Sequence, residues 1–277
     1  MASIIQSNEL GFHYGRRTIF KDLSFAVESG EVVALLGANG VGKTTLLNVI
    51  AGLLRADAGA ITVDGTNVSE WERRELSRFV ALVPQNLEIP FSFRVDEVVA
   101  QGRVPYLGKF GAMSAHDRDV VEHAMEAVDV TSLRDRVYSE LSGGERQRVK
   151  IAIGLAQQPR VMLLDEPTQH LDIGRQIEVV NLLKRLNRSG ITIFAAIHDL
   201  SIVRDNFCNA VLLMNQSCVA GSMAEVMKPA ILEEAFRVDA SAVRAFCEVE
   251  TPVVETEATR ECRRPHIERR WRLGRRR

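Results

Sequence analysis

A short glycine-rich stretch constrains this chain more than any other feature. Residues 37–45 read Gly-Ala-Asn-Gly-Val-Gly-Lys-Thr-Thr, which fits the pattern GxxxxGKT. An apolar run at 32–36 precedes the stretch and a helix-like segment at 46–50 follows it, so the sequence predicts a strand, a tight turn and a helix. Backbone N–H groups in such a turn can close around a triphosphate, because glycine has no side chain to block them.

The side chains of this stretch complete the predicted triphosphate site. Lys43 is expected between the β- and γ-phosphates, and the Thr44 hydroxyl is expected to hold Mg²⁺. The other predicted contacts in the stretch are Gly37, Asn39, Gly40, Gly42 and Thr45. A glycine-rich turn that binds nothing is the alternative, and the flanking strand and helix argue against it.

The remaining hydrophobic pattern predicts an α/β fold with two kinds of sheet. Residues 10–15 and 23–27 alternate like antiparallel strands, whereas 161–165, 191–197 and 210–214 are continuous apolar runs typical of buried parallel strands. Residues 176–186 supply a helix between the first two of these runs. Between about 86 and 140 the patterns are helical, with candidate helices at 95–101 and after Ser114, so this stretch is predicted to be an inserted helical subdomain.

Two acidic residues end one of the buried strands. Asp165 and Glu166 follow the run at 161–164, and a carboxylate placed there beside a phosphate loop can hold Mg²⁺ through water. The next carboxylate can orient or deprotonate the attacking water. We assign Asp165 to the metal and Glu166 to the water, although a solvated acidic turn would have the same local sequence.

A second anion site is predicted at residues 141–145, which read Leu-Ser-Gly-Gly-Glu and open another helix. The N–H groups of Gly143 and Gly144 and the Ser142 hydroxyl would bind the anion, and Glu145 is the last residue of this motif. One chain already has a phosphate loop, so the second site indicates that two chains share each nucleotide.

These motifs together resemble those of the ATP-binding-cassette (ABC) ATPases, whose signature motif is LSGGQ. The resemblance covers about residues 3–240 and implies a P-loop NTPase core with an antiparallel β subdomain and the helical insertion. It further implies that ATP and Mg²⁺ are bound, and that ATP closes a head-to-tail homodimer. Glu145 departs from the glutamine of the family motif.

The same resemblance assigns roles to four further residues. Tyr14 matches the aromatic that stacks on adenine, with a half-buried strand tyrosine as the alternative. Gln85 matches the glutamine that senses Mg²⁺ and the attacking water, and His198 matches the histidine that contacts the γ-phosphate. Gln85 and His198 would form the catalytic set together with Glu166 and Lys43. Asp172 matches the loop that crosses the dimer interface, although Gln169 and His170 replace the usual serine and alanine before it.

Two classes of ABC ATPase remain open: a transporter subunit, or a soluble protein of DNA repair or translation. The chain has no long coiled-coil interruption and no second cassette, which favours a transporter subunit with a separate membrane permease. Residues 98–106 and 168–176 are similar to segments of importers for ferric siderophores, haem and cobalamin, although another solute remains an alternative. An external solute-binding protein would then be an indirect partner. The permease could contact an apolar set that we expect to be exposed, formed by Leu87, Ile89, Phe91 and Phe93.

The charge is unevenly distributed along the chain. The net charge is −1, yet residues 260–277 hold nine arginines and two glutamates, a net of +7 that leaves −8 for residues 1–259. The acidic body argues against a specific nucleic-acid partner. Residues 241–277 are predicted to be an extension with a basic, disordered end. The start of the chain lacks the pattern of a signal peptide, so we expect a cytoplasmic protein, peripheral on the inner face of the cell membrane.

Overall fold

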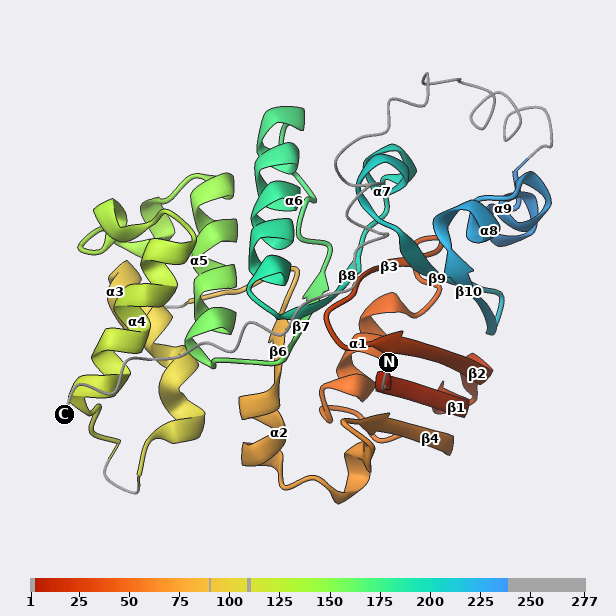
Figure 1. Cartoon of the computed structure of the whole chain (residues 1–277), viewed down its shortest axis with the longest axis horizontal. Coiled ribbons are helices and arrows are strands. Elements are labelled where there is room, and N and C mark those ends of the chain that lie inside the picture. Colours follow the sequence, from red (N-terminus) through yellow and green to blue (C-terminus); the bar gives the residue numbers. More distant parts are fainter. Residues whose placement is uncertain (1–2, 90, 109–110, 239–277) are drawn as a thin grey trace.

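The computed structural model describes residues 3–89, 91–108 and 111–238. Two sheets form its centre, with helices packed around them (Figure 1). The extension expected at 241–277 lies outside the described residues, so its disorder stays a prediction.

The first sheet is antiparallel and has the strand order β2-β1-β4-β5. Its strands are β1 (Ser3–Tyr14), β2 (Arg17–Glu28), β4 (Ala58–Val63) and β5 (Thr66–Asn67). Gly15, in the turn between β1 and β2, has a φ of 58°, which glycine adopts without strain. The antiparallel strands predicted around 10–15 and 23–27 are confirmed.

The second sheet has the order β10-β9-β3-β8-β7-β6. It consists of β3 (Val32–Leu36), β6 (Val80–Val83), β7 (Val161–Asp165), β8 (Thr192–Ala196), β9 (Asn209–Met214) and β10 (Ser217–Ser222). The strands from β9 to β6 are parallel, and β10 pairs antiparallel with β9 at the edge. The predicted parallel strands are therefore confirmed, and their carboxyl ends meet at one edge of the sheet.

Layers of apolar side chains cover both faces of the parallel sheet. Val33 and Leu35 of β3 pack towards the antiparallel sheet and α1 (Lys43–Ile50), whereas Ala34 and Leu36 pack towards the larger helical layer. Burial on both faces explains why these strands are continuously apolar in the sequence. The other helices of the core are α2 (Arg73–Phe79), α5 (Gly143–Ala156), α6 (Ile173–Arg188), α7 (Leu200–Asn206), α8 (Met223–Val226) and α9 (Pro229–Phe236).

The helical stretch between β6 and β7 lies together at one end of the molecule, far from the antiparallel sheet (Figure 1). It contains α3 (Val95–Ala100), α4 (Ala115–Ala127) and the start of α5. The 3₁₀ turns of this stretch are η2 (Gln101–Tyr106), η3 (Thr131–Leu133) and η4 (Tyr138–Glu140). Elsewhere in the chain, the 3₁₀ turn η1 (Val68–Glu70) follows β5. Ser114 and Asp117 form a capping box at the start of α4, and the helix predicted after Ser114 is confirmed.

The segment after α3 continues as the 3₁₀ turn η2. Gly102 lies against α5 so closely that a Cβ atom would stand 2.3 Å from the Ile153 carbonyl oxygen. Arg103 is almost fully buried, and its guanidinium donates to Asp117 at 2.9 Å and to the Ala156 carbonyl at 2.7 Å. This part of the chain is therefore packed core that links α4 and α5.

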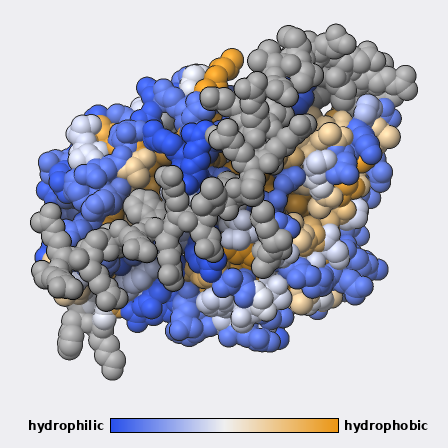
Figure 2. Space-filling model, in the orientation of Figure 1, coloured by the Kyte–Doolittle hydropathy of each residue, from blue (hydrophilic) through white to orange (hydrophobic). Residues whose placement is uncertain are grey.

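The surface carries few large apolar side chains among the described residues. Figure 2 shows a face on which hydrophilic residues predominate, with smaller apolar areas between them. Phe91 and Phe93 are exposed, whereas Leu87 and Ile89 are partly buried and pack against the core. The prediction that all four of these apolar side chains are exposed is therefore wrong for Leu87 and Ile89. Within the described ranges, we find no helix with the length and hydrophobicity that a membrane span requires.

Candidate functional site

Two glycines shape the loop between β3 and α1. Gly37 has a φ of 141°, and a Cβ atom there would stand 2.7 Å from the carbonyl oxygen of Leu213. Gly42 has a φ of 116°, and a Cβ atom there would stand 2.6 Å from Ile19 Cγ2. Any other residue would be strained at both positions and would also clash. The loop therefore depends on glycine for its path, as well as for access to its backbone N–H groups.

Lys43, the first residue of α1, folds back over this loop. Its ammonium donates to the carbonyl of Gly37 at 2.9 Å and to that of Ala38 at 3.4 Å, and lies 3.9 Å from Glu166 Oε1. Burial lowers the pKa of Lys43, while the Glu166 and Asp165 carboxylates oppose that shift. The loop thus holds a buried cation where the sequence places the phosphates.

Thr44 and Asp165 meet at the start of α1. The Thr44 hydroxyl donates to Asp165 Oδ2 at 2.8 Å, joining the phosphate loop to the end of β7. Asp165 is buried, its pKa is raised chiefly by that burial, and its Oδ1 has no hydrogen-bond partner among the described residues. A buried oxygen without a partner beside a hydroxyl fits Mg²⁺, which prefers such ligands.

The other predicted residues of the loop differ in exposure. Thr45 is buried beneath the loop, whereas Asn39 and Gly40 are exposed at its tip. Gly40 has a φ of 74° and open space around it. The tip is therefore accessible to a ligand.

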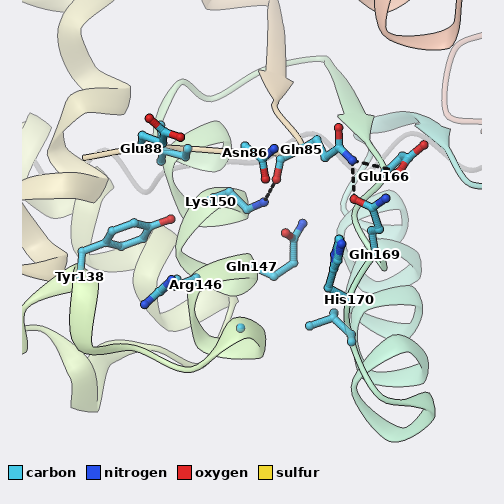
Figure 3. Close-up of a pocket in the computed structure, with 13 residues that line it drawn as sticks. Gln85, Asn86, Glu88, Tyr138, Arg146, Gln147, Lys150, Glu166, Gln169 and His170 are labelled. Atoms are coloured by element: carbon cyan, nitrogen blue, oxygen red, sulfur yellow. Dashed lines mark hydrogen bonds between the residues drawn. The ribbon is translucent and has the colours of Figure 1, made fainter. Parts of the chain in front are cut away.

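Glu166 connects the phosphate loop to Gln85. Its φ is 49°, and its backbone N–H donates to the Ala196 carbonyl at 3.0 Å, so the chain turns sharply as it leaves β7. Gln85 Nε2 donates to Glu166 Oε2 at 3.1 Å and also to Gln169 Oε1 (Figure 3). The structure therefore brings together five residues that the sequence singles out: Lys43, Thr44, Gln85, Asp165 and Glu166.

A cavity of about 350 Å³ lies beside this cluster. Its walls come from the segment after β6, from the first turns of α5 and from the turn after β7. Figure 3 shows Gln85, Lys150 and Gln147 around it, with His170 on the opposite wall. Gln147 is buried, and its Nε2 atom has no hydrogen-bond partner among the described residues.

The second predicted anion site lies at the start of α5. Ser142 is the N-cap, and its hydroxyl and backbone N–H both donate to Glu145 Oε2, at 2.7 and 2.8 Å. These hydrogen bonds lower the pKa of Glu145. Ser142 and Gly143 are exposed, and Gly144 lies against the Arg175 side chain. The two glycines and the serine are thus at the surface, and Glu145 closes a capping box.

Three further predicted residues are exposed at the surface. Tyr14 is 51% exposed at the end of β1, with its ring edge-on to Phe12 at 4.9 Å between centroids. His198 is exposed two residues after β8, on the edge where the parallel strands end. Asp172 is exposed and caps α6, accepting a hydrogen bond from the Arg175 N–H at 3.0 Å.

Sequence reasoning missed two side chains of the cluster. Lys150 donates to the carbonyls of Gln85 and Pro84, at 2.6 and 3.2 Å, and burial lowers its pKa to about 8. Gln169, which in sequence only departs from the family motif, accepts a hydrogen bond from Gln85. The available signal was a single lysine between Val149 and Ile151 in an otherwise apolar stretch of α5.

The chain is similar in sequence and in fold to known proteins. Residues 20–169 match the family model described as "ABC transporter". The chain is 36% identical over 242 residues to the iron(3+)-hydroxamate import ATP-binding protein of Bacillus subtilis, covering 86% of this chain and 90% of that protein. It is 37% identical over 235 residues to the hemin import ATP-binding protein of Thermobifida fusca, covering 84% and 82%. A solved metal-chelate type ABC transporter in an inward-facing conformation superposes with a TM-score of 0.77 at 30% identity, covering 86% of this chain and 90% of that one.

Proposed function

Because the chain belongs to the ABC transporter family, in which it is an ATP-binding and ATP-hydrolysing cassette, we propose that it powers the import of a metal chelate such as a ferric siderophore or haem. The observation that carries the proposal is its similarity to chelate-import cassettes along nearly their whole length, at 36% and 37% identity. The likeness to a metal-chelate type transporter supports the same class. Residues 3–240 would be the ATPase domain, with the helical subdomain at about 86–140.

We assign ATP to the loop between β3 and α1. Lys43 and the loop N–H groups would bind the phosphates, and Tyr14 would stack on the adenine. Thr44 and Asp165 would hold Mg²⁺, with Gln85 near it, and the ion would supply positive charge to the phosphate oxygens. Glu166 would orient the attacking water and accept its proton, since its carboxylate lies at the end of β7 beside Lys43.

Two copies of the chain would complete each site. Ser142, Gly143 and Asp172 are exposed, so they would be free to face a second molecule. We propose that the start of α5 in one copy binds the γ-phosphate held by the other, opposite His198. ATP would then hold the copies together, and hydrolysis would let them separate.

A membrane permease would be moved by the two copies as they close on ATP and separate after hydrolysis. The exposed Phe91 and Phe93, which pack edge to face with centroids 6.0 Å apart, offer it an apolar contact beside the Gln85 segment. The protein would thus be cytoplasmic, peripheral on the inner face of the membrane, with a solute-binding protein as an indirect partner. Substituting Phe91→Asp is expected to uncouple ATP hydrolysis from transport and to leave ATP binding unchanged; unchanged transport would refute this surface.

The catalytic assignment is tested with Glu166→Gln. The amide cannot take a proton, so ATP turnover is expected to fall about 100-fold or more, while ATP binding persists and a closed dimer accumulates. Phosphate release and size-exclusion chromatography with ATP measure the two effects. Glu234→Gln, the same change at an exposed position of α9, is the matched control. Turnover near that of the unsubstituted protein would refute the role of Glu166.

The solute class is tested by co-expression with candidate permeases. A permease for a metal chelate is expected to co-purify with the chain and to raise its ATPase rate. Association with permeases of another solute class only, or stimulation by DNA or ribosomes without membranes, would contradict the proposal.

A further inference from the structure

Lys150 is a buried cation that the proposed chemistry does not use. It lies two turns into α5, with 8% of its surface exposed, between the fully buried residues Val149 and Ile151. Burying an ammonium is costly unless hydrogen bonds compensate it. A lysine at such a position therefore needs partners that hold it there.

Those partners are main-chain carbonyls of the segment that carries Gln85. The Lys150 ammonium donates to the Gln85 carbonyl at 2.6 Å and to the Pro84 carbonyl at 3.2 Å. A hydrogen bond from a charged donor is stronger than a neutral one, and two of them fix the position of one peptide turn. Lys150 thus pins the chain where it leaves β6.

The side chain of Gln85 points from this pinned turn towards Glu166. Its amide donates to Glu166 Oε2 at 3.1 Å, and in Figure 3 dashed lines join Lys150 to Gln85 and Gln85 to Glu166. On the far side, Glu166 lies 3.9 Å from the Lys43 ammonium. One chain of contacts therefore runs from α5 through Gln85 to the phosphate loop.

The space around Gln85 makes this anchoring important. The cavity of about 350 Å³ adjoins Gln85, Lys150 and Glu166, so packing alone does not fix the glutamine. Without the lysine, the turn at Pro84 and Gln85 would lose two donors and could shift into that space.

We propose that Lys150 is a positioning residue for ATP hydrolysis, which holds the main chain of Gln85 so that its amide stays against Glu166. The proposal rests on the role of Glu166 given above. Because Ser142 is the N-cap of α5, the helix that would present its first turn to a second copy would also set the geometry of Gln85 in its own site.

The test compares Lys150→Met with Lys150→Arg in the full chain. Methionine keeps the apolar length and removes the donors, and roughly a tenfold fall in kcat is expected with little change in KM for ATP, since Lys43 and the phosphate loop are untouched. Arginine retains charged donors and has the adjoining cavity for its larger head, so it is expected to recover most of the kcat. Lys21→Met, at an exposed lysine of β2, is the matched control.

A double-mutant cycle separates positioning from general structure. Since Lys150 acts through Gln85, Lys150→Met is expected to lower kcat in the unsubstituted chain but to add little in a Gln85→Ala background. Urea unfolding of each variant shows whether the folded protein is retained. An equal fall in both backgrounds, or an arginine variant as slow as the methionine one, would overturn the proposal. By contrast, normal turnover in Glu166→Gln would refute the catalytic role of Glu166 on which this proposal rests.

Discussion

Replacing Arg103 by methionine should destabilise the helical end of the molecule. The guanidinium is 1% exposed, donates to Asp117, to the Ala156 carbonyl and to Gln158, and stacks on the Tyr106 ring at 3.7 Å. Methionine fills much of the same volume but leaves the Asp117 carboxylate and the Ala156 carbonyl without their charged partner.

The magnitude follows from these contacts. Breaking a buried ion pair by removing one partner costs about 3–5 kcal/mol. Asp117 keeps its hydrogen bonds from the Ser114 hydroxyl and N–H, at 2.6 and 2.9 Å, so the cost should lie near the lower limit, about 3 kcal/mol. At roughly 2–4 °C per kcal/mol for a chain of this size, Tm should fall by about 6–12 °C.

Urea and thermal unfolding measure this loss for Arg103→Met, Asp117→Asn and the double variant. Because the two residues share one buried interaction, the double variant should be more stable than the sum of the single losses implies. Arg16→Met, at an exposed arginine between β1 and β2, is the matched control and should change stability by less than about 0.5 kcal/mol. A loss below about 1 kcal/mol for Arg103→Met, or strict additivity, would refute the reasoning.

Two other substitutions and the pH dependence of stability provide further tests. Gly42→Ala places a Cβ atom 2.6 Å from Ile19 Cγ2 at a φ of 116°, so ATP affinity measured by calorimetry should fall at least about tenfold; an unchanged affinity would contradict the role of the loop geometry. Tyr14→Ala removes an exposed ring and should weaken ATP binding about fivefold without lowering Tm, whereas a large loss of Tm with normal binding would favour a purely structural tyrosine. The folded pKa of Asp117 is lowered to about 2, chiefly by its hydrogen bonds with Ser114, so its contribution to stability is present above pH 4 and is lost as pH falls towards 2. The stability difference between the unsubstituted chain and Asp117→Asn should shrink over that range, and a constant difference would refute the assignment.

Much of the fold was predictable because its signals are local. The buried strands β7 and β8 are almost continuously apolar, and the Ser114 box marks the start of α4 within four residues of sequence. The phosphate loop is similarly local, since its path depends on glycines within a single turn.

The contacts that join distant segments were not predictable in the same way. In sequence, Arg103 resembles an ordinary surface cation, and only the apolar residues around Lys150 indicate that it is buried. Both are buried, and carbonyl groups from other elements accept hydrogen bonds from their charged ends. Leu87 and Ile89 resemble exposed apolar residues in sequence but pack against the core, since only the tertiary arrangement decides which side of their segment faces inward. Neither periodicity nor composition carries such information.

The bonds within the phosphate loop have a consequence for how fast a ligand can be captured. Val41 N–H donates to the Ala38 carbonyl at 3.3 Å, and the Lys43 ammonium ties the carbonyls of Gly37 and Ala38 to α1. The backbone of this turn is therefore already ordered in the folded protein, so little conformational entropy is lost when a ligand binds. Capture of a nucleotide by this loop should then be limited by diffusion and by the exchange of lysine hydrogen bonds rather than by slow rearrangement of the backbone.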